Sequence, residues 1–196
     1  MQIVVALTGA SGVIYGIRML EALKKLKVES HLVMSEWAEK NIEIETDLTA
    51  EYVRSLASRY YDDSDMAAPI SSGSFKVNGM AVIPCSMKTL SGIANAVDDS
   101  LITRAAGVCI KESRKLVVVP RETPLSRIHL DNMVKVAQNG VIVLPAMPGF
   151  YHRPRTIDDL INHVVGKTLD QFGIEHKLFA RWTGGKNLAK KQVIDR

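Results

Sequence analysis

Short apolar runs alternate with amphipathic stretches along the chain. Five β-branched runs are predicted to be strands, namely Ile3–Leu7, Ser30–Met34, Met80–Pro84, Leu116–Pro120 and Val141–Leu144. Nearly every position of these runs is apolar, which is typical of parallel strands covered on both faces. The pattern predicts an α/β fold, a doubly wound parallel sheet in a Rossmann-like three-layer sandwich.

Helical periodicity fills the stretches between these runs. The helix after the first strand is expected to bury one face, formed by Val13, Ile17, Leu20 and Leu23. The clearest helix is Ile157–Phe172, where apolar residues recur at the three-to-four spacing of an amphipathic helix. Another helix precedes the fifth strand and is predicted to end at Gly140.

Length and composition indicate one domain, residues 1–185, followed by a basic tail, residues 186–196. The net charge is +4, but basic and acidic residues are interspersed, which disfavours a nucleic-acid binder. Cys85 and Cys109 form no CxxC pair, so neither a disulfide framework nor a zinc site is expected. Without a signal-peptide pattern or an apolar run approaching about 18 residues, we expect a cytoplasmic protein with no membrane segment.

The strand-to-helix turns carry the candidate chemistry, because ligands of open parallel sheets bind outside the carboxyl ends of the strands. The first turn, Thr8–Gly12, offers small residues and backbone amides at a helix start, where a phosphate is favoured. It matches neither the GxGxxG fingerprint nor the Walker P-loop, which disfavours a standard dinucleotide or ATP site. A helix cap at Ser11 with tightly packed glycines explains the turn equally well.

Two further turns place hydroxyl groups at helix starts. Ser35 follows the second strand and is more simply explained as a plain N-cap than as a ligand. In the third turn, Ser86, Lys88 and Thr89 cluster and could hold a polar edge of a flat ligand. Cys85 beside them is predicted to be a buried small residue, not a nucleophile.

Charged residues gather after the fourth strand and on the helix before it. Arg121 and Glu122 could form an ordinary surface ion pair or act on a ligand. Arg104 and Lys111 lie seven residues apart, hence on one helix face, which a solvated surface also explains.

A proline-rich loop, residues 145–154, carries Tyr151 and is unusual for a mere connector. The site would comprise Lys167, the cations named above, two or three acids and this tyrosine, without a metal-ligand cluster. The chemistry indicated is phosphate handling without a metal ion.

Several longer stretches resemble one known family. They are LTGASGVIYGIRML, ETD, PCSMKTLSGIA, RAAGVCIKESRKLVVVPRETPLSRIHLDNM and PAMPGFYHRP. In these stretches the chain resembles the UbiX-type flavin prenyltransferases, and within them the branch that is named after phenolic acid decarboxylase. The resemblance extends from Gln2 to about Trp182 and is far more specific than any single glycine motif.

This resemblance implies a flavodoxin-like fold that binds reduced FMN and dimethylallyl phosphate. The prenyl group would be attached to the central ring nitrogen of the flavin and an adjacent ring carbon, closing a fourth ring. The prenylated FMN would serve a partner UbiD-type decarboxylase, and no metal would be needed. The resemblance also implies a homo-oligomer, in which trimers assemble into a dodecamer with sites at subunit contacts.

The motifs also imply residue roles. The residues that would contact FMN are Gly9, Ala10, Ser11, Ser35, Ser86, Met87, Lys88, Thr89 and Arg104. Those that would surround the allylic phosphate or the prenyl group are Lys111, Arg121, Glu122, Tyr151, Lys167 and Trp182. Glu45 would lie near the reacting groups, and Glu45, Lys111, Glu122 and Tyr151 would be catalytic. Part of the family has Arg in place of Lys167, which keeps the charge but not a bidentate phosphate contact.

Three other functions remain open at this point. A flavin-dependent decarboxylase of the phosphopantothenoylcysteine type would share the fold, but it has a PASANT-like motif where this chain has PCSMKT and a PxMN motif where this chain has PAMPGF. The branch name suggests direct decarboxylation of an aromatic acid. A flavin-binding protein without chemistry of its own is the third alternative.

Overall fold

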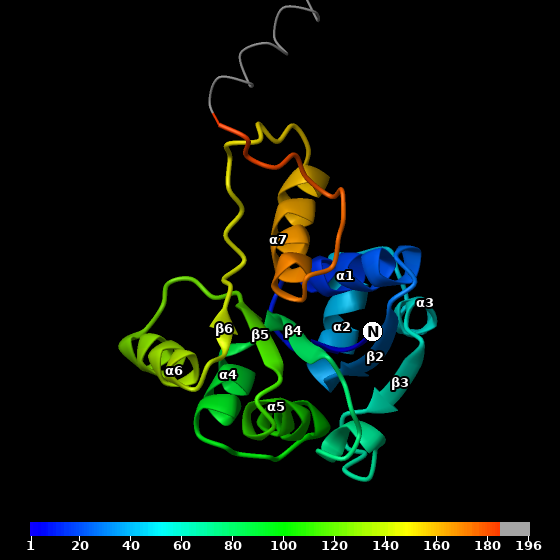
Figure 1. The fold of residues 1–196 in the computed structure, drawn as a ribbon, viewed down its shortest axis with the longest axis vertical. Helices are drawn as coiled ribbons and strands as arrows, with labels where there is room; N and C mark the ends of the chain where they lie inside the picture. Colours follow the sequence, from blue (N-terminus) through cyan, green and yellow to red (C-terminus); the bar gives the residue numbers. More distant parts are fainter. Residues whose placement is uncertain (185–196) are drawn as a thin grey trace, which may run out of the picture.

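Six parallel strands form the central sheet of the computed structural model, which describes residues 1–184 (Figure 1). They are β1 (Gln2–Leu7), β2 (Glu29–Met34), β3 (Arg59–Asp62), β4 (Gly79–Cys85), β5 (Lys115–Pro120) and β6 (Ile142–Val143). The strand order is β3-β2-β1-β4-β5-β6, so the chain builds outward from β1 and then crosses back to continue at β4. The doubly wound α/β fold predicted from the sequence is confirmed.

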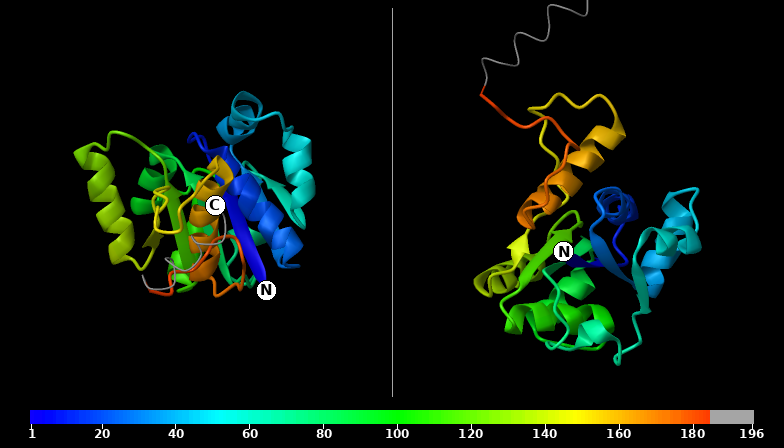
Figure 2. Two further views of the ribbon diagram at one scale, coloured as in Figure 1. Left: turned by 90° about the horizontal axis from the view of Figure 1, so that it is seen from above. Right: turned by 45° about the vertical axis from the view of Figure 1, so that its right-hand side comes forward.

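Helices cover both faces of this sheet (Figure 2). They are α1 (Val13–Lys25), α2 (Glu36–Glu45), α3 (Ala50–Leu56), α4 (Met87–Ala94), α5 (Leu101–Lys111), α6 (Arg127–Gln138), α7 (Ile157–Gln171) and a 3₁₀ turn, η1 (Pro69–Ser71). α1, α2, α3 and α7 pack on one face, and α4, α5 and α6 pack on the other. Within residues 1–184, none of the helices is long and apolar enough to cross a membrane.

The two edge strands depart from the sequence prediction. β3 is missing from the prediction because its residues are exposed or half-buried at the sheet edge, so no apolar run marks it. At the other edge, β6 comprises only Ile142–Val143, although the apolar run predicts Val141–Leu144. The predicted basic tail, residues 186–196, lies outside the described residues.

Both cysteines are free thiols buried in the core. Burial raises the pKa of Cys85 to about 12 and that of Cys109 to about 11. Because the thiolate is the reactive form, neither residue is suited to nucleophilic chemistry. The prediction that Cys85 is a buried small residue is confirmed.

The carboxyl ends of β1 and β4 are joined through one buried side chain. The hydroxyl of Thr8 donates to the carbonyl oxygen of Pro84 at 2.9 Å and accepts from the backbone N–H of Ser86 at 2.7 Å. Thr8 directly follows β1, and Ser86 directly follows β4. The hydroxyl therefore positions the two strand-to-helix turns relative to each other.

Helix α1 lies unusually close to the sheet beneath these turns. A Cβ atom at Gly16 would lie 2.4 Å from the carbonyl oxygen of Ile83 and 2.5 Å from Cγ of Leu7. Only a residue without a side chain allows this separation, because the obstacles are a strand backbone and a fully buried leucine.

Replacing Gly16 by Ala is expected to lower the free energy of unfolding by about 1–3 kcal/mol, because the added methyl group pushes α1 off the sheet. The matched control is Gly107→Ala in α5, where the new Cβ would meet the Asp98 side chain at 3.2 Å. There the helix propensity of Ala should leave stability unchanged or raise it by up to about 1 kcal/mol. Urea unfolding followed by circular dichroism measures both changes. Equal changes in the free energy of unfolding for the two variants would mean that the space beside Gly16 accommodates a methyl group.

Candidate active site

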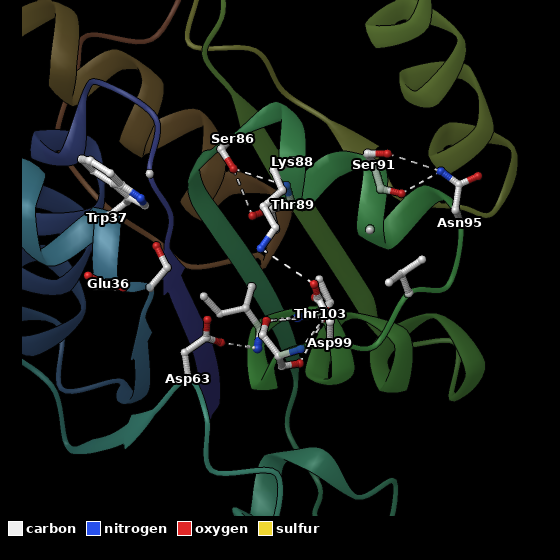
Figure 3. Close-up of a pocket in the computed structure, with 16 residues that line it drawn as sticks. Glu36, Trp37, Asp63, Ser86, Lys88, Thr89, Ser91, Asn95, Asp99 and Thr103 are labelled. Atoms are coloured by element: carbon white, nitrogen blue, oxygen red, sulfur yellow. Dashed lines mark hydrogen bonds and ion pairs between the residues drawn. The ribbon is translucent and has the colours of Figure 1, made fainter.

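A cavity of about 620 Å³ opens at the carboxyl ends of β1, β2 and β4 (Figure 3). It lies where the strand order reverses, because β1 and β4 are neighbours whose following helices cover opposite faces of the sheet. Ligands of doubly wound folds bind at this kind of position. Of the residues predicted to contact FMN, the cavity wall contains Gly9, Ser35, Ser86, Lys88 and Thr89.

Three helices, α2, α4 and α5, begin at the wall of this cavity. Ser35 caps α2, with its Oγ accepting from the N–H of Ala38 at 3.2 Å, and Ser86 caps α4 by accepting from the N–H of Thr89 at 3.2 Å. The cap role proposed for Ser35 is confirmed. Because the partial positive charge of a helix lies at its N-terminus, this part of the wall favours an anionic group.

The first turn of α2 lies so close to Gly9 that only glycine fits at this position. A Cβ atom at Gly9 would lie 2.6 Å from Cβ of Trp37, which is the second residue of that helix. The indole of Trp37 is largely exposed and lines the cavity across from Lys88 (Figure 3). The glycine therefore lets α2 approach the first turn and brings an aromatic side chain to the cavity.

The remaining charges on the cavity wall are mostly acidic. Glu36, Asp63 and Asp99 line it, whereas Lys88 is the basic side chain among its lining residues, with its Nζ 3.7 Å from Oδ2 of Asp99. Asp63 Oδ1 accepts from the N–H of Ile102 at 2.9 Å, and burial raises the pKa of its carboxyl group. A phosphate in this cavity would therefore depend on the helix starts and on Lys88.

The first turn already binds a carboxylate of the chain itself. The N–H groups of Gly12 and Val13 donate to Oε2 of Glu45 at 2.8 and 3.1 Å. Gly12, at φ +99°, is the N-cap residue of α1, so the explanation of Ser11 as the helix cap is wrong. Glu45, the last residue of α2, thus compensates the partial positive charge at the start of α1.

Arg121 contacts the turn after β1 and does not pair with its neighbour Glu122. Its Nε donates to the carbonyl oxygen of Ser11 at 2.9 Å, whereas Oε1 of Glu122 accepts from the N–H of Thr123 at 3.1 Å. An Arg121–Glu122 ion pair is therefore not formed, and that alternative is wrong. Both carboxylates, Glu45 and Glu122, are exposed.

Tyr151 lies in a separate cluster of rings between the loop before α7, α7 itself and the segment after it. Its ring meets Trp182 edge-on with the centroids 6.0 Å apart, and its Oη lies 3.1 Å from Nε2 of His163. Lys167 follows one turn later on α7, with its Nζ 3.9 Å from Oδ2 of Asp170. The loop before α7 extends away from the carboxyl ends of β1, β2 and β4, and none of these rings lines the cavity (Figures 1 and 2).

Arg104 and Lys111 also lie outside the cavity wall. The Nε of Arg104 donates to the carbonyl oxygen of Ser71 at 3.0 Å, and its Nη1 lies 3.2 Å from Oδ2 of Asp98. Lys111 ends α5, about 15 Å along the helix axis from the start of α5 at the cavity. Its Nζ lies 2.5 Å from Oε1 of Glu112. One chain therefore does not bring these two cations to the other predicted site residues.

Sequence reasoning missed several cavity residues, among them Trp37, Asp63, Asn95 and Asp99. Asp63 follows the edge strand β3, which no apolar run marks, so its place at the carboxyl edge could not be inferred. The stretch DDSLIT carried a usable signal, since Ser100 and Thr103 form a capping box at the start of α5. In residues 1–184, no group of three or more His, Cys, Asp or Glu residues is arranged to hold a metal ion.

Comparisons with known proteins show the family of the chain. Residues 1–169 match the family model described as Flavoprotein. The chain is 52% identical over 185 residues to a probable UbiX-like flavin prenyltransferase of Escherichia coli O157:H7, covering 94% of each chain.

Two solved structures have the same fold and a similar sequence. One is a dodecameric FMN-dependent UbiX-like decarboxylase from Escherichia coli O157:H7, with a TM-score of 0.92 and 52% identity over 94% of this chain and 100% of that one. The other is AnUbiX (PadA1) in complex with FMN and dimethylallyl pyrophosphate, with a TM-score of 0.93 and 52% identity over 94% of this chain and 98% of that one. The chain therefore belongs to the UbiX-type flavin prenyltransferases of the flavoprotein family.

Proposed function

We propose that this flavin prenyltransferase transfers the dimethylallyl group of dimethylallyl phosphate to reduced FMN without a metal ion. The product would pass to a separate UbiD-type decarboxylase in the cytoplasm. The observation that carries the proposal is the cavity of about 620 Å³ at the switch point, with the starts of α2 and α4 in its wall. Its volume lies within the usual range for small-molecule sites.

The cavity offers a specific place for the phosphate of FMN. The amides at the start of α1 already bind Glu45, whereas α2 and α4 begin at Ser35 and Ser86 with their positive ends at the cavity wall. Lys88, in the first turn of α4, adds a full positive charge there. We therefore assign the FMN phosphate to the starts of α2 and α4, and the flavin rings to the side of Gly9 and Trp37.

The prenyl donor requires groups that stabilise a departing phosphate. Reduced FMN, when bound, supplies the electron-rich ring nitrogen and the adjacent carbon that receive the prenyl group. Hydrogen-bond donors and cations of this chain would stabilise the charge that develops on the phosphate, which is the usual largest contribution in such a step. We assign this role to Lys111, Arg121, Tyr151 and Lys167, and the removal of the ring-carbon proton to Glu122.

We further propose that neighbouring copies of the chain complete the site. The cavity of one chain is lined by more acidic than basic side chains, and Arg104, Lys111 and Lys167 lie elsewhere. The loop before α7, which contains Tyr151, extends from the body of the fold (Figure 1). The dodecameric relative from Escherichia coli O157:H7 supports an assembly in which such an element reaches the cavity of another copy.

The function is tested by anaerobic incubation of the protein with reduced FMN and dimethylallyl phosphate, followed by mass spectrometry of the flavin. We expect a flavin heavier by one prenyl unit, also in the presence of EDTA, because the proposed donors are side chains. Dimethylallyl pyrophosphate in a parallel reaction measures donor preference. An unmodified flavin in both reactions, or carbon dioxide release from a hydroxybenzoate by this chain alone, would contradict the proposal.

Lys88→Met should weaken FMN binding by about tenfold, the typical contribution of one charge-assisted contact to a phosphate. Riboflavin, which lacks the phosphate, should bind the variant as well as it binds the wild type. The side chain of Lys88 is 87% exposed, so its loss should not affect folding. Lys25→Met, at the far end of α1, is the control. Fluorescence titration with both flavins measures the affinities. An equal loss of affinity for FMN and riboflavin would show that the phosphate does not bind at Lys88.

Glu122→Gln should lower the rate of flavin prenylation by about 10²–10⁴, because the amide cannot accept the proton lost on ring closure. It should leave FMN affinity unchanged, since the amide oxygen can still accept from the N–H of Thr123. Glu43→Gln on the exposed side of α2 is the control for loss of one negative charge. Single-turnover mass spectrometry gives the rate, and a near-normal rate in Glu122→Gln would assign the proton transfer to another group.

A further inference from the structure

We infer that His163 is a positioning residue that directs the hydroxyl proton of Tyr151 outward, toward the leaving phosphate. This inference deepens the proposed function and rests on it. It starts from the two ring nitrogens of His163, which both have partners. Nδ1 lies 3.2 Å from the backbone nitrogen of Gly149, and Nε2 lies 3.1 Å from Oη of Tyr151.

The contact with Gly149 determines which nitrogen carries the proton. A backbone N–H can only donate, so Nδ1 must offer its lone pair to the N–H of Gly149. In a neutral imidazole the proton then resides on Nε2, and Nε2 donates to the oxygen of Tyr151. An imidazolium would place two N–H groups face to face at Gly149, which disfavours the charged form.

The surroundings of His163 also disfavour a positive charge. Burial lowers the pKa of the imidazole, and the nearby His152 and Lys167 lower it further. His152 stacks on His163 with the ring centroids 4.9 Å apart and the planes 2° from parallel. Phe179 covers another side of the ring at 4.9 Å. Asp170, further along α7, is paired with His176 and Arg181.

The hydrogen bond from His163 determines the direction in which the O–H of Tyr151 points. Its oxygen accepts from His163, so the tyrosine cannot also donate to that nitrogen, and its own O–H must point to another acceptor. The side chain is partly exposed, which leaves the hydroxyl accessible. The arrangement is compact, because a Cβ atom at Gly149 would lie 3.1 Å from Cε1 of Tyr151 and 3.3 Å from Cε1 of His163. The hydroxyl is thus kept as a hydrogen-bond donor for a phosphate oxygen.

Two substitutions separate this role from simple packing. His163→Leu removes the donor to Tyr151, and we expect kcat/KM for dimethylallyl phosphate to fall roughly 10- to 100-fold, the range for one hydrogen bond to a charged group. FMN affinity should not change. His163→Gln can still donate an amide N–H to Tyr151 and should restore most of the loss. His129→Gln on α6 is the control for the substitution itself.

The decisive comparison is made in a Tyr151→Phe background. Without the hydroxyl, His163 has nothing to direct, so adding His163→Leu should cause little further loss. An equal loss in both backgrounds would overturn the inference and leave His163 with a packing role. As the pH falls well below 6.5, the ordinary pKa of histidine, Nδ1 becomes protonated and can no longer accept from the N–H of Gly149, which displaces the ring from Tyr151. The ratio of wild-type to His163→Gln activity should then fall. A ratio that does not change with pH would contradict that step.

Solid-state ¹⁵N spectra of histidine-labelled protein test the tautomer without any substrate. At pH 7.5 we expect the His163 resonances, identified by their loss in His163→Gln, to show an unprotonated Nδ1 and a protonated Nε2. A protonated Nδ1 would overturn the inference even if prenylation is observed. If the wild type forms no prenylated flavin, the proposed function fails, while the spectrum still decides the direction of the hydrogen bond.

Discussion

The close approach of α1 to the ends of β1 and β4 is the constraint on which the rest of the structure depends. Gly16 permits that approach, because any side chain there would overlap the backbone of Ile83. Thr8 then joins the two strand ends by accepting and donating hydrogen bonds. With these ends held together, the turns after β1 and β4 border one cavity. The start of α4 at the cavity follows from this junction, whereas the start of α2 comes close to the first turn because of Gly9.

The helix starts near the cavity differ in whether a carboxylate of the chain is bound to them. The amides at the start of α1 bind Glu45, whereas the starts of α2 and α4 are capped by uncharged serines. The positive ends of α2 and α4 therefore remain available to an anion, while that of α1 does not. Two of the cations expected around the prenyl donor are near carboxylates of their own surroundings, Lys111 near Glu112 and Lys167 near Asp170, whereas Arg121 contacts the carbonyl oxygen of Ser11. Lys111 and Lys167 therefore lie outside the wall of the cavity in one chain.

The interior of the fold could be predicted from the sequence, and its edges could not. Strands such as β1 and β4 are buried on both faces, so burial requires an apolar residue at nearly every position and makes the run visible. β3 lies at the sheet edge with exposed and half-buried residues, so no such requirement acts on it. Consequently Asp63, which follows β3 and lines the cavity, was also missed.

By itself the sequence determined the fold class, the family and three turns that border the cavity, because local pattern and motif spacing are properties of the chain. It identified Ser35 and Ser86 as helix-start residues, which the structure bears out. Only the tertiary structure decided that Glu45 binds the amides at α1, that Arg121 contacts Ser11 instead of Glu122, and that the N–H of Gly149 faces Nδ1 of His163. Each of these depends on groups brought together from different elements, and neither propensity nor periodicity contains that information.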